Sequence, residues 1–537
     1  AVRGKLVPQD PNDEPASELL KRIAAEKAEL VKQGKIKKQK PLPEISEEEK
    51  PFELPEGWEW VTFSHLGYFF GGKTPSKMKD EYWGGTIPWV TPKDMKTNLI
   101  VDSEDKVTPL ALEDGLTKVS PGSILFVARS GILRRIFPVA ITSIECTVNQ
   151  DIKVLSPFFS DISYYILLMM NGFERYIIEN LTKTGTTVES LLFEDFISHP
   201  FMIPPFAEQN RILSTVKKLM SLCDQLEQQS LTTLDAHQQL VETLLGTLTD
   251  SQNAEELAEN WARISEHFDT LFTTEASVDA LKQTILQLAV MGKLVPQDPN
   301  DEPASELLKR IAQEKAQLVK EGKIKKQKPL PPISDEEKPF ELPEGWEWCR
   351  LNDISSKITD GDHKTPPRIA EGYKLLSAKN IRDGYLDYNN CDYISAIDYE
   401  KSRERCLPEK GDLLIVSVGG TIGRSSLIKD CSDFALVRSV AIIKPLLIEP
   451  EYLKLAMDSK LLQSMIHSHK RGGAQPCLYL GEISKFLFPT PPLAEQRNIV
   501  NKVSILMEKC RFLFLGLQSA QQTQLHLADA LTDAAIN

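Results

Sequence analysis

The sequence predicts an α+β fold in which two α/β domains are separated by long, antiparallel, coiled-coil-like helices, with an approximate two-fold internal repeat along the chain. Three observations lead to this prediction. Residues 1–60 recur at 289–348 with six differences. Each copy is followed by short apolar runs separated by Gly and Pro, which is typical of strands. Each of these stretches then leads into a long run of residues with apolar side chains at helical spacing.

The repeat sets the number of modules. The string GKLVPQDPNDEPASELLKRIA stands identically at positions 4 and 292, and PPFAEQNRI from Pro204 is echoed by PPLAEQRNI from Pro491. A period of about 288 residues is far longer than the repeat of a stacked solenoid. A chain of 537 residues also exceeds what a single hydrophobic core supports. We therefore expect two large modules in tandem.

Each module begins with a helix and a linker. Residues 16–33 carry apolar side chains at helical spacing, and Gly34 is suited to end that helix. The basic, proline-rich linker KIKKQKPLP follows. An irregular α/β stretch comes next, with strand-like runs such as TIPWV, SILFVA, YKLLSA and DLLIVSV.

Each module ends with a long helix. Residues 208–248 contain no Pro and no Gly before Gly246, and their apolar side chains recur every three or four positions. About forty residues would make a helix of roughly 60 Å. A similar helix is expected from 496 to about 531, with an interruption at Gly516. Two such helices would pack antiparallel, and separate helical bundles are the alternative.

These patterns divide the chain into six expected segments. They are a helical repeat and linker (1–60), a first α/β domain (61–203), central spacer helices (204–291), a second repeat and linker (292–348), a second α/β domain (349–490) and a C-terminal spacer helix (491–537). Ala1 aligns with Ala289, which lies late in the apolar helix that begins near Ser277. We expect a matching helical segment to precede Ala1 in the first module.

The string GYFFGGKT at 67–74 fits the phosphate-loop pattern, which would suggest an NTPase. That pattern needs a buried strand before it and a helix that begins at its Lys-Thr. Here Pro75 follows, and the next residues have no apolar stripe. The second module keeps Lys364-Thr365-Pro366 but not the phosphate-loop glycines. The shared feature is a Lys-Thr-Pro loop, so nucleotide binding is not predicted.

Composition indicates the cellular location, the state of the cysteines and whether a metal site is expected. The longest apolar runs fall far short of the roughly 20 residues of a membrane span, and no signal peptide opens the chain, so we expect a cytoplasmic protein without a membrane partner. Eight scattered cysteines without C-x-x-C indicate reduced thiols. The pair His467 and His469 has no third ligand nearby, so no metal site is expected.

The net charge of −13 lies mostly outside the two α/β stretches. Residues 61–200 carry 13 Lys and Arg against 16 Asp and Glu, and residues 349–487 carry 20 against 18. The acidic helices would repel phosphates, which favours a scaffolding or protein-contact role for them. The nearly neutral domains could still present a basic face.

Several loops offer cations and amides at matching places in the two modules. Lys470 and Arg471 precede two glycines and Gln475, and the corresponding first loop holds Lys183 and Thr184. Arg or Lys can bind guanine, and Gln can bind adenine. The candidate DNA-binding residues are Lys73, Thr74, Lys93, Arg134, Arg135, Lys183, Thr184, Thr186, Lys364, Thr365, Lys379, Asn380, Arg424, Arg438, Lys470, Arg471 and Gln475. Each could also be an ordinary solvated loop residue.

With its near-identical repeats, LPEGWEW at 54 and 342, and PPFAEQ or PPLAEQ before each long helix, the chain resembles the specificity subunit of a Type I restriction–modification system. The resemblance implies that each α/β stretch is a target recognition domain reading one half of a bipartite, asymmetric site in double-stranded DNA. It also implies that the helices space the domains and dock two modification (methyltransferase) subunits that methylate adenine. Restriction (translocase and endonuclease) subunits would join through the complex.

The motifs of catalysis are not found in this sequence. Ile203-Pro204-Pro205-Phe206 and Thr490-Pro491-Pro492-Leu493 lack the polar first residue of an adenine-methylation motif, and no convincing S-adenosylmethionine loop follows a strand. We expect a non-catalytic chain without a cofactor, with S-adenosylmethionine, ATP and Mg on the partner subunits. Two alternatives stay open: a two-domain protein-binding scaffold without DNA specificity, and an enzyme active on its own.

Overall fold

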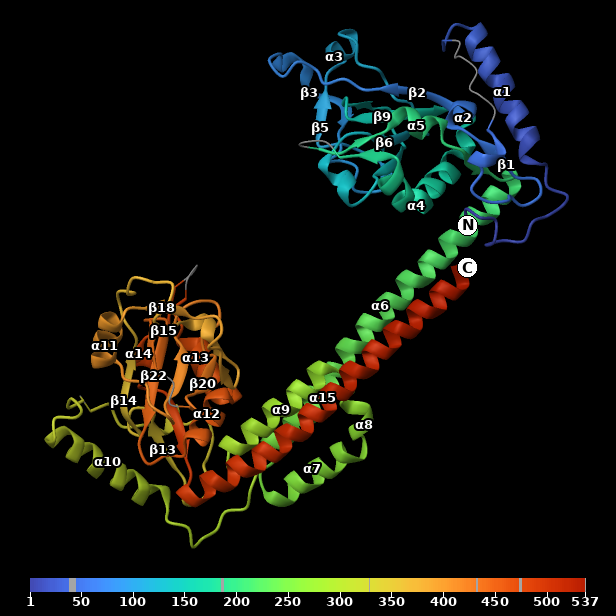
Figure 1. Cartoon of the computed structure of the whole chain (residues 1–537). Helices are drawn as coiled ribbons and strands as arrows, with labels where there is room; N and C mark the ends of the chain where they lie inside the picture. The colour runs from blue at the N-terminus through green and yellow to red at the C-terminus, as the bar shows by residue number, and fades with distance from the viewer. Residues whose placement is uncertain (38–44, 185–187, 328, 431–432, 473–475, 537) are drawn as a thin grey trace. The chain divides into compact units, whose positions relative to one another are not determined.

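The computed structural model describes residues 1–37, 45–184, 188–327, 329–430, 433–472 and 476–536. The chain divides into two compact units, Ala1–Ser230 and Leu231–Asn537 (Figure 1). Helix α6 (Phe206–Asp250) begins in the first unit and ends in the second. Each unit contains one α/β domain. The boundaries of the six expected segments stay a prediction, because this division falls inside α6.

The first α/β domain is built on two sheets. The larger has the order β2 (Gly67–Gly71), β9 (Ile152–Pro157), β6 (Ile124–Val127), β7 (Val139–Thr142) and β4 (Leu99–Ile100). All neighbours are antiparallel except β4 and β7. The smaller has the order β5 (Asp105–Val107), β3 (Trp83–Val90) and β8 (Thr147–Val148). The predicted strands TIPWV and SILFVA are therefore confirmed.

Helices and two short strand pairs complete this unit. The helices are α1 (Ala16–Lys32), α2 (Phe63–Leu66), α3 (Pro109–Glu113), α4 (Ser163–Asn180) and α5 (Phe193–Ser198). Strand β1 (Glu59–Val61) pairs with β12 (Phe201–Ile203), and β10 (Thr182–Lys183) pairs with β11 (Ser190–Leu191). The buried rings of Phe63 and Phe201 lie 4.8 Å apart in the core. The helix predicted over 16–33 is confirmed, and Gly34, the residue after its C-cap Gln33, has φ of +69°.

The second α/β domain repeats this plan. Its main sheet has the antiparallel order β14 (Ser355–Asp360), β22 (Val440–Pro445), β19 (Leu413–Val416) and β20 (Ser425–Leu427). A second sheet holds β18 (Asp392–Ile394), β15 (Tyr373–Leu376) and β21 (Phe434–Leu436). Two strand pairs are β13 (Glu347–Arg350) with β23 (Leu487–Thr490), and β16 (Ile381–Arg382) with β17 (Tyr385–Leu386). The helices are α10 (Ala304–Lys320), α11 (Ala396–Arg405), α12 (Pro450–Asp458), α13 (Lys460–His469) and α14 (Leu480–Ile483).

A bundle of helices forms the rest of the second unit. It contains the end of α6, then α7 (Ala254–Glu266), α8 (Phe268–Leu271), α9 (Glu275–Val290) and α15 (Leu493–Ile536). Gln518 of α15 donates to Glu275 Oε1 (3.2 Å), and Lys282 lies 4.9 Å from the Phe514 ring. Residue numbers rise along α9 as they fall along α15, so these two helices are antiparallel.

The end of α6 runs in the same direction as α9. His237 Nε2 lies 3.2 Å from Thr270 O, and Lys293 Nζ donates to Thr249 O (2.6 Å). Within the second unit α6 is therefore antiparallel to α15, as the sequence predicts. The expected interruption at Gly516 is wrong, because α15 continues through it. One glycine costs a helix only about 1 kcal/mol, which packing of the neighbouring turns readily offsets.

The repeated motifs form one joint in each unit. Trp58 Nε1 donates to Glu208 Oε2 (3.0 Å), and Gln9 Nε2 donates to Glu208 Oε1 (3.2 Å). The second unit repeats these bonds: Trp346 donates to Glu495 (2.9 Å), and so does Gln297 (3.1 Å). Both carboxylates are buried at the start of a long helix. The motifs thus hold each domain, its N-terminal repeat segment and its long helix together.

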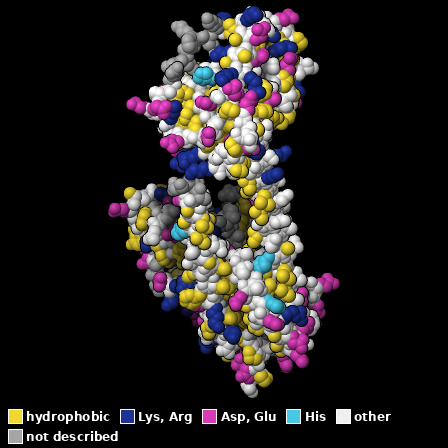
Figure 2. All heavy atoms as spheres, turned by 90° about the vertical axis from the view of Figure 1, so that its right-hand side faces the viewer, with side chains coloured by type: hydrophobic (Ala, Val, Ile, Leu, Met, Phe, Trp, Pro, Cys, Tyr) yellow, Lys and Arg dark blue, Asp and Glu magenta, His cyan; other side chains and the backbone are white. Residues whose placement is uncertain are grey.

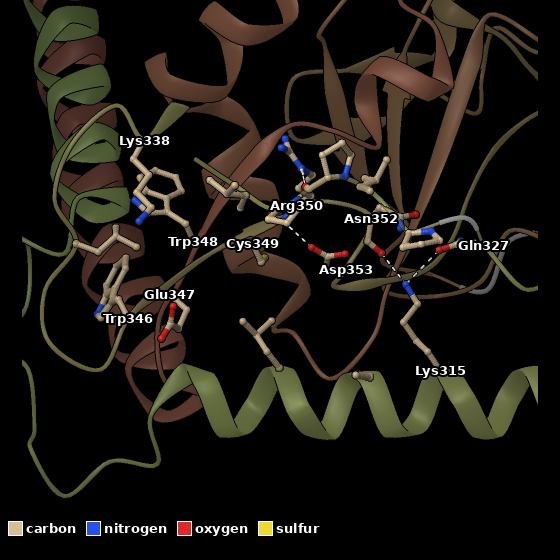
Figure 3. Close-up of a pocket in the computed structure, with 18 of the residues that line it drawn as sticks. Lys315, Gln327, Lys338, Trp346, Glu347, Trp348, Cys349, Arg350, Asn352 and Asp353 are labelled. Carbon is tan, nitrogen blue, oxygen red and sulfur yellow. Dashed lines mark hydrogen bonds between the residues drawn. The ribbon is translucent and has the colours of Figure 1, made fainter. Parts of the chain in front are cut away.

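The repeat helix is attached to its domain by a half-buried lysine. Lys315 Nζ on α10 donates to Asn352 O (2.7 Å) and to Gln327 Oε1 (3.3 Å), beside a groove of about 1230 Å³ that Trp346 and Trp348 help to line (Figure 3). Lys27 on α1 makes the matching bond to Ser64 O (2.9 Å). Burial lowers the pKa of both ammonium groups. A desolvated lysine on a backbone carbonyl fixes each helix at one position on its domain.

Candidate nucleic-acid interface

One end of the main sheet gathers the candidate loops of the first domain. Strands β2 and β6 finish there, and β9 and β7 start there, because these neighbours are antiparallel. The loops that follow or precede them carry Lys73, Thr74, Arg134 and Arg135. A bridge between Arg129 and Ser190 places the β10–β11 hairpin, with Lys183, beside them. Residues spread over more than one hundred positions thus share one end of the sheet.

The second domain repeats this arrangement. Strands β14 and β19 finish, and β22 and β20 start, at one end of the four-stranded sheet. Lys364, Arg424 and Arg438 lie in the loops at that end. Val418 forms a bridge with Cys477, and Cys477 with Arg471, so the loop after α13 joins the same cluster. We call these two loop clusters the first and second loop faces.

A glycine positions the Lys-Thr-Pro loop in each face. A Cβ on Gly72 would lie 1.9 Å from Val148 O, and one on Gly361 would lie 2.0 Å from Leu436 O. The chain therefore needs Gly at both places to pass close to a strand of the smaller sheet. Residues 67–71 are a strand, and no helix begins at Lys73. The glycines of the phosphate-loop pattern thus have a packing role.

The first Lys-Thr-Pro loop is held by side chains from several elements. The Lys73 ammonium donates to Asp114 O (3.1 Å), and Trp89 Nε1 donates to Lys73 O (3.2 Å). Thr74 donates to the Gln150 side chain. The Lys73 side chain is exposed in this fixed loop, so its charge is presented to solvent from a defined position.

Residues of α11 hold the second loop. Arg405 Nη2 donates to Asp360 Oδ1 (2.7 Å) and to His363 Nε2 (2.7 Å). Ser402 donates to Asp362 Oδ2. Lys364 and Thr365, which follow directly, are exposed. Sequence reasoning missed Arg405 and Ser402, because some forty residues separate them from the loop and no motif links them to it.

Several candidate cations have a carboxylate partner. Arg134 pairs with Glu189, Arg424 with Asp383 (3.5 Å), Arg471 with Glu482 (3.6 Å) and Lys379 with Asp392 (3.3 Å). Ion pairs at a surface contribute little to stability, about 0 to 1 kcal/mol. Their main effect here is to orient the cations. Figure 2 shows Lys and Arg interspersed with Asp and Glu on the visible face, in keeping with the nearly neutral domains.

Lys93 and Lys379 occupy equivalent positions in a turn after β3 and β15. The side chain of Asp94 accepts from Thr91 N (2.8 Å), and that of Asn380 accepts from Ser377 N (2.9 Å). Asn380 is fully buried and also donates to Asp387 O and Asn390 O, each at 2.9 Å. The expectation that Asn380 contacts DNA is therefore corrected, because its polar atoms already stabilise this turn.

Most of the other candidate side chains reach solvent. Exposed residues among them are Lys73, Lys93, Arg134, Arg135, Lys183, Thr184, Lys364, Thr365, Lys379, Arg438, Lys470 and Arg471. Thr74 and Arg424 are half-buried. Thr186 and Gln475 lie outside the described residues. Among the described residues, no cluster of three or more His, Cys, Asp or Glu could hold a metal ion, and no helix is long and apolar enough to span a membrane.

Comparison with known proteins assigns the chain to a family. The family profile of the Type I restriction modification DNA specificity domain matches residues 55–236 and 343–513, which include both loop faces. The chain belongs to the Type I restriction–modification DNA specificity family. Members of this family are DNA-recognition subunits without catalytic activity of their own, and this chain holds two target recognition domains.

Relatives in the family match along the whole chain. The specificity subunit of the Type I restriction enzyme EcoAI of Escherichia coli is 50% identical over 557 residues, covering 100% of this chain and 92% of the relative. That of EcoEI, also of Escherichia coli, is 46% identical over 553 residues with the same coverage. A chain in a solved structure of a Type I restriction–modification system is 16% identical, with a TM-score of 0.44 over 90% of this chain and 98% of that chain.

Proposed function

We propose that this specificity subunit reads a bipartite, asymmetric site in double-stranded DNA, one half with each loop face. The single observation that carries the proposal is the recurrence of an exposed, cation-bearing loop cluster at the same end of the main sheet in both domains. Lys and Arg suit phosphates and guanine edges. The loops differ in sequence between the domains, so two different half-sites are expected.

The long helices would set the separation of the two half-sites. Half-sites read from one face of B-DNA lie about 34 to 36 Å apart. Helix α6 has 45 residues, which at 1.5 Å per residue is roughly 68 Å. A helix of that length is sufficient to hold two domains apart at such a distance.

The same helices offer surfaces for partner subunits. Apolar side chains about half exposed along α6 are Leu219, Leu222, Leu226, Leu231 and Leu234. Exposed apolar residues in such a series are typical of a protein interface. We propose that two modification subunits dock on the helices, bind S-adenosylmethionine and methylate adenine. Restriction subunits with ATP and Mg would complete the assembly in the cytoplasm.

Exchanging one domain tests the proposal. Residues 349–487 would be replaced by the matching segment of another family member, and the complex with its modification subunits would be expressed in a host. Sequencing of methylated adenines should show one half-site changed and the other half-site and the gap preserved. A change in both half-sites, or in neither, would contradict the division of the target between the two domains.

The dependence of binding on salt concentration distinguishes a DNA-binding subunit from a protein-binding scaffold. If the loop faces contact phosphates, log K for DNA falls linearly with log salt, because counterions are released. Binding that does not depend on salt would favour the scaffold.

A further inference from the structure

The Lys-Thr-Pro loops continue into a second shared pattern. The residue four positions after Lys73 is Lys77, and the next is Met78. At the same distance from Lys364 stand Arg368 and Ile369. Each domain therefore places a cation and then a large apolar residue beyond its loop. Met78 is 96% exposed and Ile369 is 44% exposed.

Met78 lies in a turn that the rest of the domain holds in place. Lys79 N donates to Ser76 O (3.2 Å), and Trp83 Nε1 donates to the same carbonyl (3.2 Å). The Lys79 ammonium donates to Tyr82 Oη (2.6 Å) and lies 4.6 Å from the centre of that ring. With both sides of the turn anchored, the apolar side chain is presented to water from a fixed backbone.

The turn belongs to the first loop face. Trp83 bonds Ser76 O, Trp89 bonds Lys73 O, and the centroids of these two indole rings lie 5.0 Å apart. One tryptophan pair thus supports both the Lys-Thr-Pro loop and the turn that carries Met78.

Ile369 is fixed in a comparable way. Its N–H donates to Tyr393 O (2.9 Å) beside β18. Arg368 Nε lies 3.0 Å from Asp392 Oδ2, and Lys379 Nζ lies 3.3 Å from the other oxygen of that carboxylate. Arg368 and Lys379 therefore share the Asp392 carboxylate, and Ile369 directly follows Arg368 in the loop that carries Lys364.

A single exposed apolar residue needs no special explanation in a soluble protein. Here a large apolar residue recurs five positions after the lysine of the Lys-Thr-Pro loop in both domains, although the domains differ elsewhere. In each domain it lies on a backbone segment held by hydrogen bonds, and a cation precedes it. Apolar side chains contact thymine methyl groups in the major groove or enter base steps from the minor groove. Flanking cations suit the adjacent phosphates.

We propose that Met78 and Ile369 are the apolar base contacts of the two loop faces, each burying its side chain against the bases of its own half-site, with Lys77 and Arg368 on the flanking phosphates. This inference rests on the proposed function and adds to it two residues that determine specificity.

The test measures the affinity of the complex with its modification subunits for DNA duplexes. These duplexes carry the target sequence identified by methylation mapping. Met78→Ala should weaken binding to the full target by about tenfold, the loss expected for one base contact. It should leave affinity unchanged for a duplex whose first half-site is scrambled. Ile369→Ala should give the mirror result for the second half-site. Met78→Leu, which stays apolar and long, should retain most of the affinity.

Val101→Ala is the matched control, since Val101 is 64% exposed and follows β4, which runs parallel to β7 and therefore ends away from the first loop face. Its affinity should equal that of the wild type. Wild-type affinity in Met78→Ala would overturn the inference. The inference would also be overturned if Met78→Ala lost the same affinity for target and scrambled duplexes and changed the dependence of affinity on salt. The side chain would then affect phosphate contacts or folding, not base recognition. If the wild type itself binds target and scrambled DNA equally, the proposed function fails as well.

Discussion

At the scale of single residues, the structure separates side chains that are free to meet a ligand from side chains that hold the site together. Lys364 and Thr365 reach solvent, whereas Asn380 is buried in a turn. The residues that fix the second loop, Arg405 and Ser402, come from α11. A loop that must read bases needs such fixing, because a flexible loop loses entropy when it binds.

Arg405→Ala should therefore weaken recognition of the second half-site. The effect does not require contact between Arg405 and DNA, because Arg405 acts by holding the loop. Removing the guanidinium takes from Asp360 and His363 their shared 2.7 Å donor, and the loop before Lys364 loses an anchor. We expect a loss of affinity for the full target of about tenfold to one hundredfold, because a hydrogen bond to a charged group contributes about 1.5 to 3 kcal/mol. Competition binding with duplexes altered in one half-site measures it.

Lys401→Ala, an exposed cation on the same helix, is the matched control and should bind as the wild type does. Arg405→Lys should recover part of the affinity. An equal effect on both half-sites would show that Arg405 does not act through the second loop.

At the scale of elements, the joint at the start of each long helix explains why the repeated motifs are so similar. A buried carboxylate accepts from an indole N–H and from an amide in both units. Burial raises the pKa of Glu495, while the bonds from Gln297 and Trp346 oppose that shift. A buried anion is stable only with its donors in place, so the three segments of the joint depend on one another.

Trp346→Phe should destabilise the second unit, because Glu495 then loses a donor that water cannot replace. The cost is expected to be about 1 to 3 kcal/mol, the usual penalty of an unpaired buried polar group. Denaturant unfolding followed by circular dichroism would measure it. Trp348→Phe is the control, since its indole donates to the Phe340 carbonyl at a half-buried site and should cost less. Equal losses in the two variants would contradict the role given to the carboxylate.

At the scale of the whole molecule, two equivalent domains are attached to helices that far exceed the length a single domain needs. Within the second unit α9 and α15 are antiparallel, and α6 enters that bundle from the first unit. This organisation favours a spacer role for the helices.

An insertion of seven residues, two helical turns, into the exposed middle of α6 tests that role, with a matching insertion in α15. Seven residues add about 10.5 Å, which is about three base pairs at 3.4 Å per pair. The methylated target should keep both half-sites and gain about three base pairs in its gap. A target with the original gap would exclude a spacer role for these helices. Replacement of seven exposed polar residues of α6 without insertion, which leaves its exposed leucines in place, serves as the control.

The sequence by itself determined the two modules, the helices at their boundaries and the absence of a phosphate loop. The modules follow from the close identity of the two repeats, and the helices follow from the periodicity of their apolar residues. The phosphate loop is excluded because the second module has Lys-Thr-Pro but not the glycines of the phosphate-loop pattern. The predicted interruption at Gly516 was wrong: α15 continues through it, because packing overrides the weak helix propensity of one glycine.

Only the tertiary structure decided which loops meet. Lys73, Arg134 and Lys183 in the first domain, and Lys364, Arg438 and Arg471 in the second, come together because antiparallel strands return to one end of a sheet. Strand order and register are set by contacts between residues far apart in the chain, and no local pattern encodes them. For the same reason Asn380 looked like a ligand residue in the sequence and is a buried turn residue in the fold.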